Sequence, residues 1–354
     1  MNSRYIIDGV QCELTPSDVL GGGAGKSLPG SPLGGEERKP QSGISQECES
    51  SIIDETIDPS AGGAVFSVSK TKEYISLLKE FGKASYPLAF SAQHTRAAIA
   101  AALVDACWLD GAFLLENLKV DARWQWQEGP VGTQTAFYRS VEAAADYLDS
   151  LDLRIDSYSL AEGEPQLKVA ASPEDISAIR HLPDRIVPDA SSWIIYIPFD
   201  TSDYRLGGSL LAAASGNACG GTAPSVDDPD YLMDCFEVVR ELSQDGILLS
   251  ARTVLEGGLA TALDAYAAAC GADVNVSDLP AALESDDLVR LLFAEVPGAL
   301  IQIADDDFDY VDAELLLQDV MYFPLGHPAP GKPGLRIATD KRKGIEGILA
   351  SLMR

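Results

Sequence analysis

The stretch SVDDPDYLMDCFEVVRELSQDGILL, residues 225–249, predicts a helix that leads into a buried strand. Asp228 before Pro229 is typical of a helix N-cap followed by a first-turn proline, whose missing N–H costs no hydrogen bond there. Apolar residues then recur at helical spacing up to Gly246, which can end the helix, so that one stripe faces a core. This stripe consists of Leu232, Phe236, Val239 and Leu242. Ile247-Leu248-Leu249 is typical of the strand that follows.

Glycine pairs lie on both sides of this helix and strand. Leu206-Gly207-Gly208-Ser209 precedes them, and Gly257-Gly258 follows. A glycine at a strand-to-helix turn lets the backbone approach a phosphate or a neighbouring element closely, so phosphate binding and packing both remain open. Farther along, Leu292-Phe293-Ala294-Glu295-Val296-Pro297-Gly298 indicates a helix end and a turn, and residues 299–303 indicate a short apolar strand.

The order of these landmarks is similar to that in the second catalytic-type half of phosphoribosylformylglycinamidine synthase, a family of purine biosynthesis. The family carries Leu-Gly-Gly-Ser, a Val-x-Asp-Pro helix start, Gly-Gly and Phe-x-Glu-x-x-Gly, and this chain shows all four within residues 206–328. A weaker likeness extends upstream to Ala92 and includes Trp124-Gln125-Trp126. The resemblance implies a mixed α/β fold with an AIR-synthase-like two-domain architecture and, in the C-terminal domain, a mixed sheet flanked by helices.

The same resemblance implies an ATP-dependent ligase that converts an amide to an amidine with magnesium and glutamine-derived ammonia. Family members place a His-Asp pair five and four residues before the first glycine of the Gly-Gly turn, where this chain has Arg252 and Thr253. Arginine stays protonated and cannot act as a general base, and threonine cannot replace a carboxylate metal ligand without loss of charge. A second signature, Gly-Lys-Asp-Ser, should follow the strand around 153–155, where the chain has Tyr158-Ser159-Leu160-Ala161. We therefore assign no catalytic residue and expect a pseudoenzyme.

The candidate binding residues are those of the glycine turns and the arginine beside them. The guanidinium of Arg252 can clamp a phosphate with two hydrogen bonds, and a surface salt bridge with Glu256 is the alternative interpretation. ATP and magnesium are implied by the resemblance alone, and it stays open whether either is retained. The candidate phosphate or nucleotide-binding set is Gly207, Gly208, Ser209, Gly257, Gly258 and Arg252.

Acidic residues outnumber basic residues by 54 to 26, which gives a formal charge of −28. This charge repels nucleic acid and anionic membranes, so we expect neither as a partner. The densest acidic run, Asp305 to Asp319, lacks the spacing of a calcium loop and suits the positive end of a helix dipole better than a metal, so no metal site is assigned. Without a signal sequence or an 18-residue apolar run, the expected compartment is the cytoplasm.

Four segments are expected along the chain: a disordered low-complexity stretch over 1–63, a partial AIR-synthase-like N-terminal domain over 64–189, an AIR-synthase-like C-terminal domain over 190–330, and a tail with a short helix over 331–354. The glycine-rich run 21–27 lacks the first glycine and the flanking elements of a phosphate loop, which favours a linker. In the family, the sheets of two first domains pair into a shared barrel. A lone half would therefore need a homodimer mate or another synthase-like half.

Two functional hypotheses follow. The first is a phosphoribosylformylglycinamidine synthase-like protein of de novo purine biosynthesis that is catalytically impaired on its own. The alternative is a non-catalytic partner or structural subunit that pairs with an active synthase half. A truncated gene product without a selected role is a third possibility.

Overall fold

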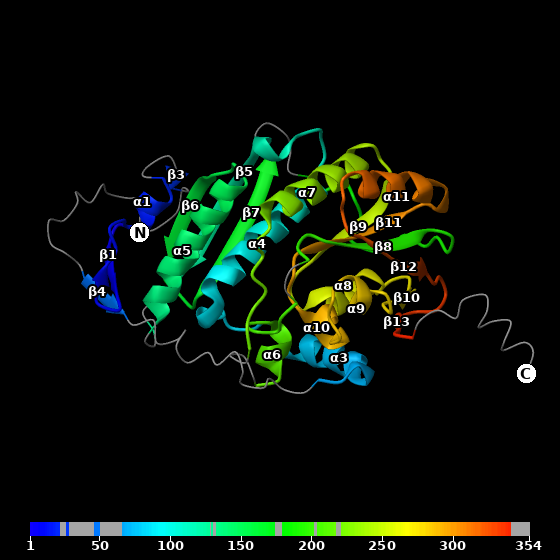
Figure 1. Cartoon of the computed structure of the whole chain (residues 1–354), viewed down its shortest axis with the longest axis horizontal. Helices are drawn as coiled ribbons and strands as arrows, with labels where there is room; N and C mark the ends of the chain where they lie inside the picture. The colour runs from blue at the N-terminus through cyan, green and yellow to red at the C-terminus, as the bar shows by residue number, and fades with distance from the viewer. Residues whose placement is uncertain are drawn as a thin grey trace, which may run out of the picture.

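A computed structural model describes residues 1–21, 26–27, 46–49, 66–127, 129, 132–173, 179–201, 204–216 and 221–340. The main body of the described chain consists of two mixed sheets flanked by helices, and a small third sheet lies at the N-terminal end (Figure 1). The first sheet has the strand order β3-β6-β5-β7, and the second has the order β13-β10-β12-β8-β11-β9. The predicted mixed α/β class is thereby confirmed.

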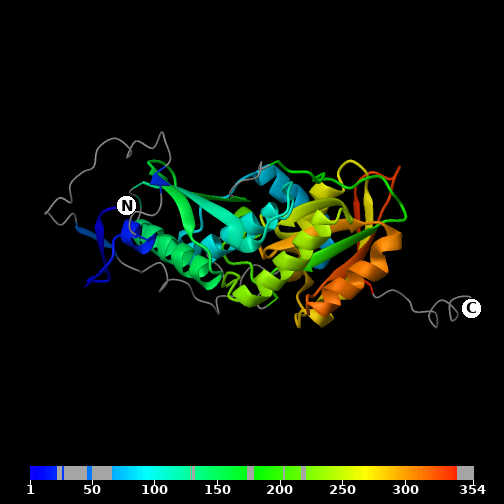
Figure 2. The same cartoon turned by 90° about the horizontal axis from the view of Figure 1, so that it is seen from above.

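The first sheet carries helices on one face. Its strands are β3 (Lys26–Ser27), β5 (Leu118–Gln125), β6 (Ile155–Ala161) and β7 (Gln166–Pro173). Helices α4 (Ser91–Ala106) and α5 (Thr133–Ser150) pack together beside them. Every second residue of β5 is buried, whereas the residues between are polar and at least partly exposed, from Lys119 to Gln125. The sheet therefore has one apolar face under the helices and one polar face. Figure 2 shows the whole chain from above, with the sheet and its helices.

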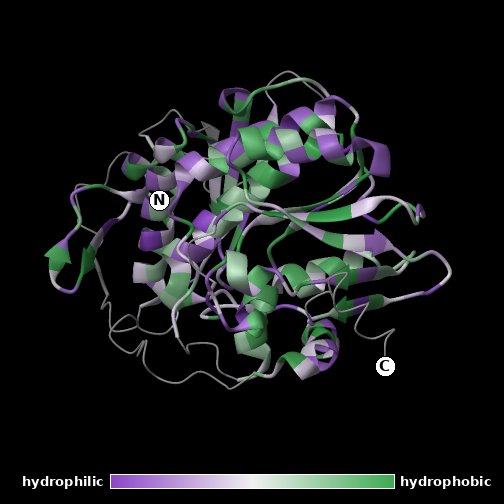
Figure 3. Cartoon of the chain, turned by 45° about the vertical axis from the view of Figure 1, so that its right-hand side comes forward, coloured by the Kyte–Doolittle hydropathy of each residue, from purple (hydrophilic) through white to green (hydrophobic). Residues whose placement is uncertain are grey.

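The second sheet is covered on both faces, because all six residues of β11 (Gly298–Ile303) are buried. Its other strands are β8 (Trp193–Pro198), β9 (Leu248–Val254), β10 (Ala272–Asn275), β12 (Phe323–Pro328) and β13 (Leu335–Ala338). Helices α7 (Pro229–Gln244) and α11 (Phe308–Leu317) cover one face, and α3 (Thr71–Phe81), α8 (Gly258–Tyr266), α9 (Leu279–Ala282) and α10 (Leu288–Phe293) lie on the other (Figure 1). Its middle strands are mostly apolar when coloured by hydropathy, whereas the helices show both apolar and polar residues (Figure 3).

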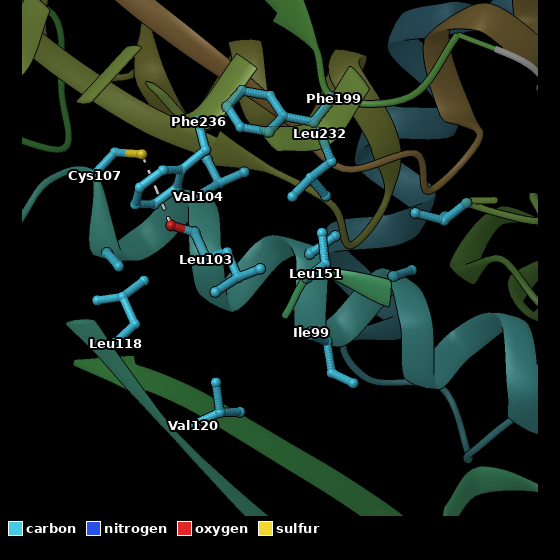
Figure 4. Close-up of a cluster of buried hydrophobic side chains, with 14 of the residues drawn as sticks. Ile99, Leu103, Val104, Cys107, Leu118, Val120, Leu151, Phe199, Leu232 and Phe236 are labelled. Carbon is cyan, nitrogen blue, oxygen red and sulfur yellow. Dashed lines mark hydrogen bonds between the residues drawn. The ribbon is translucent and has the colours of Figure 1, made fainter. Parts of the chain in front are cut away.

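One hydrophobic core joins the two sheets through α4. In Figure 4, side chains from the second half of this helix, and Cys107 directly after it, lie among side chains from β5 of the first sheet and from α7 beside the second sheet. The cluster shown there includes Ile99, Leu103, Val104, Cys107, Leu118, Val120, Leu151, Phe199, Leu232 and Phe236. Because both sheets bury apolar area against the same helix, their relative placement depends on its packing.

The helix predicted from residues 225–249 is confirmed in detail. Helix α7 begins at Pro229, and the Asp228 carboxylate accepts a hydrogen bond from the backbone N–H of Tyr231 at 3.0 Å. Gly246 follows the helix with a φ of +73°, a backbone conformation that favours glycine. All four residues of the predicted apolar stripe are buried.

The chain is more ordered at its beginning than we expected from composition. Residues 4–7 and 10–11 pair as strands β1 (Arg4–Ile7) and β2 (Val10–Gln11), and α1 (Pro16–Val19) follows with a capping box between Thr15 and Asp18. Tyr5 is buried against the rings of Phe137 and Tyr138. The expectation of disorder over 1–63 is thus corrected for residues 1–21, because aromatic contacts with α5 hold them. Strand β4 (Gln46–Glu49) pairs with β1, and most of the remaining stretch lies outside the described residues.

The predicted tail also starts later than 331. Residues 335–338 form β13, which pairs in parallel with β10 at the edge of the second sheet. The expected short helix farther along falls in residues 341–354, outside the described part of the chain. Within the described part, no helix has both the length and the apolar composition to cross a membrane.

The shared core leads to a stability prediction. Leu103 is 0% exposed, so Leu103→Ala should lower the free energy of unfolding by about 2–5 kcal/mol through lost burial and a residual cavity. Leu114→Ala, at a side chain that is 61% exposed, is the control and should change it little. Urea unfolding followed by circular dichroism measures both, and equal effects of the two substitutions would contradict the shared core.

Candidate functional site

The two glycine turns meet at the carboxylate of Glu295. Its Oε1 accepts hydrogen bonds from the backbone N–H of Leu210 at 2.8 Å and from that of Gly257 at 2.9 Å. Leu210 begins the short helix α6 (Leu210–Ala214), whose N-cap is Ser209, and Gly257 is the N-cap of α8. Three landmarks that are far apart in sequence therefore form a single structure.

Tight backbone contacts explain the glycines at this junction. A Cβ on Gly207 would lie 2.5 Å from the carbonyl carbon of Thr222, and one on Gly258 would lie 2.6 Å from the Cα of Phe293. Gly258 also has a φ of +70°, which disfavours any other residue. The structure brings together five of the six candidate binding residues, and neighbouring backbone fills the space beside Gly207 and Gly258.

Burial gives Glu295 an unusual protonation equilibrium. Loss of solvent raises its pKa to about 7, although the two backbone N–H donors from Gly257 and Leu210 favour the charged form. The largely buried carboxyl group thus titrates near neutral pH. In either protonation state one oxygen can still accept both backbone hydrogen bonds.

A small cavity of about 30 Å³ lies beside this junction. It has room for one or two water molecules and not for a nucleotide. His94 contributes to its wall, packs edge-on against the Tyr86 ring, and has its pKa lowered to about 4 by burial. The full lining is Pro87, Phe90, Gln93, His94, Ala97, Gly207, Gly208, Ala223, Pro224, Leu255 and Glu295.

The positions of the family His-Asp pair lie on the edge strand β9 and are engaged in structural contacts. The hydroxyl of Thr253 accepts a hydrogen bond from the indole N–H of Trp108 at 3.0 Å and donates one to the Asp105 carboxylate. Arg252 donates to the backbone oxygen of Asp184 at 3.3 Å and pairs with its carboxylate at 3.7 Å. Its ion-pair partner in the structure is thus Asp184 rather than the predicted Glu256.

The segment assigned to the second signature is part of a strand. Tyr158 to Ala161 lie within β6, where they pair with β5, so they form no phosphate-binding loop. The dipeptide Asp156-Ser157 directly before them matches the last two residues of Gly-Lys-Asp-Ser, and the Ser157 hydroxyl donates to the Asp121 carboxylate. Taking these two residues as the Asp-Ser of the signature would move the assignment by four positions, to residues 154–157, where the glycine and the lysine are again absent.

The acidic run holds no metal-ligand group. Asp305 accepts a hydrogen bond from the indole N–H of Trp193 at 2.7 Å, and residues 305–307 form a 3₁₀ turn before α11. Across the described ranges, no three or more His, Cys, Asp or Glu side chains come together in a way that could hold a metal ion.

Comparisons with known proteins agree with the sequence pattern. Phosphoribosylformylglycinamidine synthase from Homo sapiens is 27% identical over 235 residues, which is 62% of this chain and 17% of that protein. A probable chloroplastic/mitochondrial enzyme of the same name from Arabidopsis thaliana is 26% identical over 245 residues, covering 64% of this chain and 17% of its own length. The chain resembles the phosphoribosylformylglycinamidine synthases. The predicted resemblance is thereby confirmed.

The solved structure of T. maritima PurL complexed with ATP supports the same fold. It aligns with a TM-score of 0.50 and 14% identity over 75% of this chain and 40% of PurL. At this identity the likeness concerns the fold alone, and the predicted AIR-synthase-like architecture is confirmed at that level. No model of a protein family matches the chain. The chain spans only about a sixth of the two curated relatives, as the 17% coverage shows.

Sequence reasoning missed the central role of Glu295. It was noted only as part of the Phe-x-Glu-x-x-Gly landmark, although a single acidic residue between apolar neighbours was a usable signal. The partners of Thr253, Asp105 and Trp108, were also missed. They lie on and just after α4, and nothing in the local sequence connects them with β9.

Glu295 should make stability depend on pH. Since its folded-state pKa of about 7 exceeds the usual value of 4.5, its contribution is present at low pH and is lost as the pH rises through about 7. Glu295→Gln keeps an oxygen acceptor without the charge. Between pH 5 and pH 8, the free energy of unfolding of the wild type should therefore fall by about 1–3 kcal/mol relative to that of this variant. Urea unfolding across that range measures the difference.

Two further variants separate charge from hydrogen bonding. Glu295→Ala leaves both backbone N–H groups without their acceptor and should destabilise the protein at every pH by about 1–3 kcal/mol for each group. The exposed Glu80→Gln is the matched control and should leave the pH profile unchanged. Parallel profiles for wild type and Glu295→Gln would show that Glu295 does not titrate in this range.

Proposed function

We propose that this chain is a synthase-like protein of de novo purine biosynthesis whose own catalytic centre is impaired, and that it acts as a non-catalytic subunit beside a synthase-like half. The observation that carries the proposal is the engagement of Arg252 and Thr253 in structural contacts at the two positions where the family has a His-Asp pair. The cytoplasm is the compartment we propose for this role.

The chemistry of these side chains supports impairment. The Arg252 guanidinium offers only donors and stays protonated, so it cannot remove a proton from a substrate. The Thr253 hydroxyl is held between Trp108 and Asp105, and it brings no negative charge to a cation. Neither residue can perform general base catalysis or supply the carboxylate ligand that the family pair provides.

The residues at the glycine turns do not fit the nucleotide that the resemblance implies. A phosphate there would need free backbone N–H groups, and those of Leu210 and Gly257 donate to Glu295. The carboxylate would repel a phosphate when ionised, and the adjoining cavity is too small for one. We therefore propose that Gly207, Gly208, Ser209, Gly257 and Gly258 serve packing in this chain, and we derive no step through ATP or magnesium.

Activity and ligand binding test this proposal together. Purified chain with ATP, magnesium, ammonium and the formamide nucleotide of the family reaction should show no turnover above a protein-free blank. ATP and ADP, with or without magnesium, should not raise the melting temperature, because a ligand stabilises only the state that binds it. Turnover, or an increase in melting temperature with a nucleotide, would contradict the proposed catalytic impairment if Arg252→Ala abolished it and the control Arg154→Ala retained it.

The polar face of the first sheet, which none of the described helices covers, supports the pairing part of the proposal. Lys119, Asp121, Arg123 and Gln125 of β5 alternate with the buried residues of that strand, and Arg123 is paired in register with Lys168 of β7. Both of these cationic side chains are exposed. Such a face, with charges of both signs, suits a second sheet of matching polarity from another copy or a synthase-like half.

Charge reversal on this face should disrupt assembly. Arg123→Glu with Lys168→Glu should lower the sedimentation coefficient of a homodimer, or abolish co-purification with a synthase-like partner, because like charges would then face each other. Lys72→Glu, on the exposed side of α3, is the control. A wild-type chain that sediments as a monomer and retains no partner from its native extract would contradict the pairing.

A further inference from the structure

The outer face of α11 carries apolar side chains that the described structure leaves exposed. Leu317 is 78% exposed and Tyr310 is 44% exposed, and they lie seven positions apart on the helix, so they share one face. Ala313 lies between them and is also exposed, and Leu316 on the flank is 63% exposed. We call Tyr310, Ala313, Leu316 and Leu317 the α11 patch.

Negative charge surrounds this patch. Residues 305–319 contain seven acidic residues and no basic one. The pKa of Tyr310 is raised, most of all by the charge of Glu314. Slight burial and the charges of Asp245 and Glu241 at the end of α7 add to this effect. Acidic side chains from two helices thus lie around an apolar centre, an arrangement suited to a ligand with apolar residues and a basic margin.

The C-terminal sequence of the same chain has this chemistry. Residues 341–354 read KRKGIEGILASLMR, with four basic residues and one acidic residue in a chain of net charge −28. Ile345, Ile348, Leu349 and Leu352 follow the i, i+3, i+4, i+7 spacing of an amphipathic helix. A helix of this length is marginal in water and gains most of its stability by packing its apolar stripe.

We propose that residues 341–354 bind to the α11 patch, with Ile345, Ile348, Leu349 and Leu352 against Tyr310 and Leu317. The basic residues 341–343 then lie next to the acidic margin. The four residues ahead of Ile345 extend over at most about 14 Å, so the segment binds the patch of a second copy where its own patch lies beyond that reach. The described chain leads up to it at Asp340, whose backbone oxygen accepts a hydrogen bond from the Asn275 side chain at 3.0 Å.

Site-specific photocrosslinking in the full chain tests this proposal. A benzophenone side chain at position 317 should crosslink to residues 345–352, as identified by mass spectrometry. The same probe at position 114, which is also exposed but lies far along the chain in the first domain, should not. Mixing isotope-labelled and unlabelled copies shows whether the crosslink joins one chain or two, and either result supports the assignment.

Two combined variants and a salt titration separate the contributions. Lys341→Glu, Arg342→Glu and Lys343→Glu combined should lower the crosslink yield several-fold, and added salt should lower it in wild type, because the charges are near the surface. Ile348→Asp with Leu352→Asp should abolish it. These changes lie outside the packed core, so the melting temperature should stay close to that of wild type. Crosslinks from position 317 to another segment, or none at all, would overturn the proposal.

Discussion

The hydrogen bonds from two helix starts to Glu295 connect the landmarks of this fold. A single carboxylate oxygen accepts from Leu210 and from Gly257, which are separated from it by 85 and 38 positions. Both turns require glycine because neighbouring backbone lies within 3 Å of where a side chain would begin. The Leu-Gly-Gly-Ser turn, the Gly-Gly turn and the Phe-x-Glu-x-x-Gly segment can thus be understood as parts of one junction. The hydrogen bonds of this junction stabilise the fold whether or not a reaction is catalysed beside it.

Such a structural junction is compatible with the proposal that the chain resembles a synthase without sharing its catalytic centre. Helix α4 packs against both sheets, and its C-terminal end also contacts the edge strand β9 through Asp105, Trp108 and Thr253. A threonine at this position is a good structural partner, since its hydroxyl can donate and accept at once. In the function we propose, side chains that join two elements stand where the family has its His-Asp pair, so the fold is retained without that pair.

Local signals in the sequence predicted the local structure well. The cap at Asp228, the proline after it and the glycine at 246 define α7 without knowledge of the rest of the chain. Trp124 and Trp126, two positions apart in the sequence, are both buried, as the alternation of a strand requires. The contacts that decide the site could not be predicted, because they join distant positions. Thr253 and Asp105 are 148 residues apart, and no pattern in either neighbourhood indicates the other. Composition misled at the N-terminus, where Tyr5 is held by aromatic rings of α5 that a local scan does not connect with it.

The central claim is that the glycine turns are closed around Glu295 and serve as a structural junction. A crystal structure of the chain grown with an ATP analogue and magnesium at millimolar concentration tests it most directly. The account predicts that Glu295 Oε1 remains hydrogen-bonded to the backbone N–H of Leu210 and Gly257, with no phosphate at either turn. A phosphate group bound to those N–H groups, with the Glu295 side chain displaced, would contradict it.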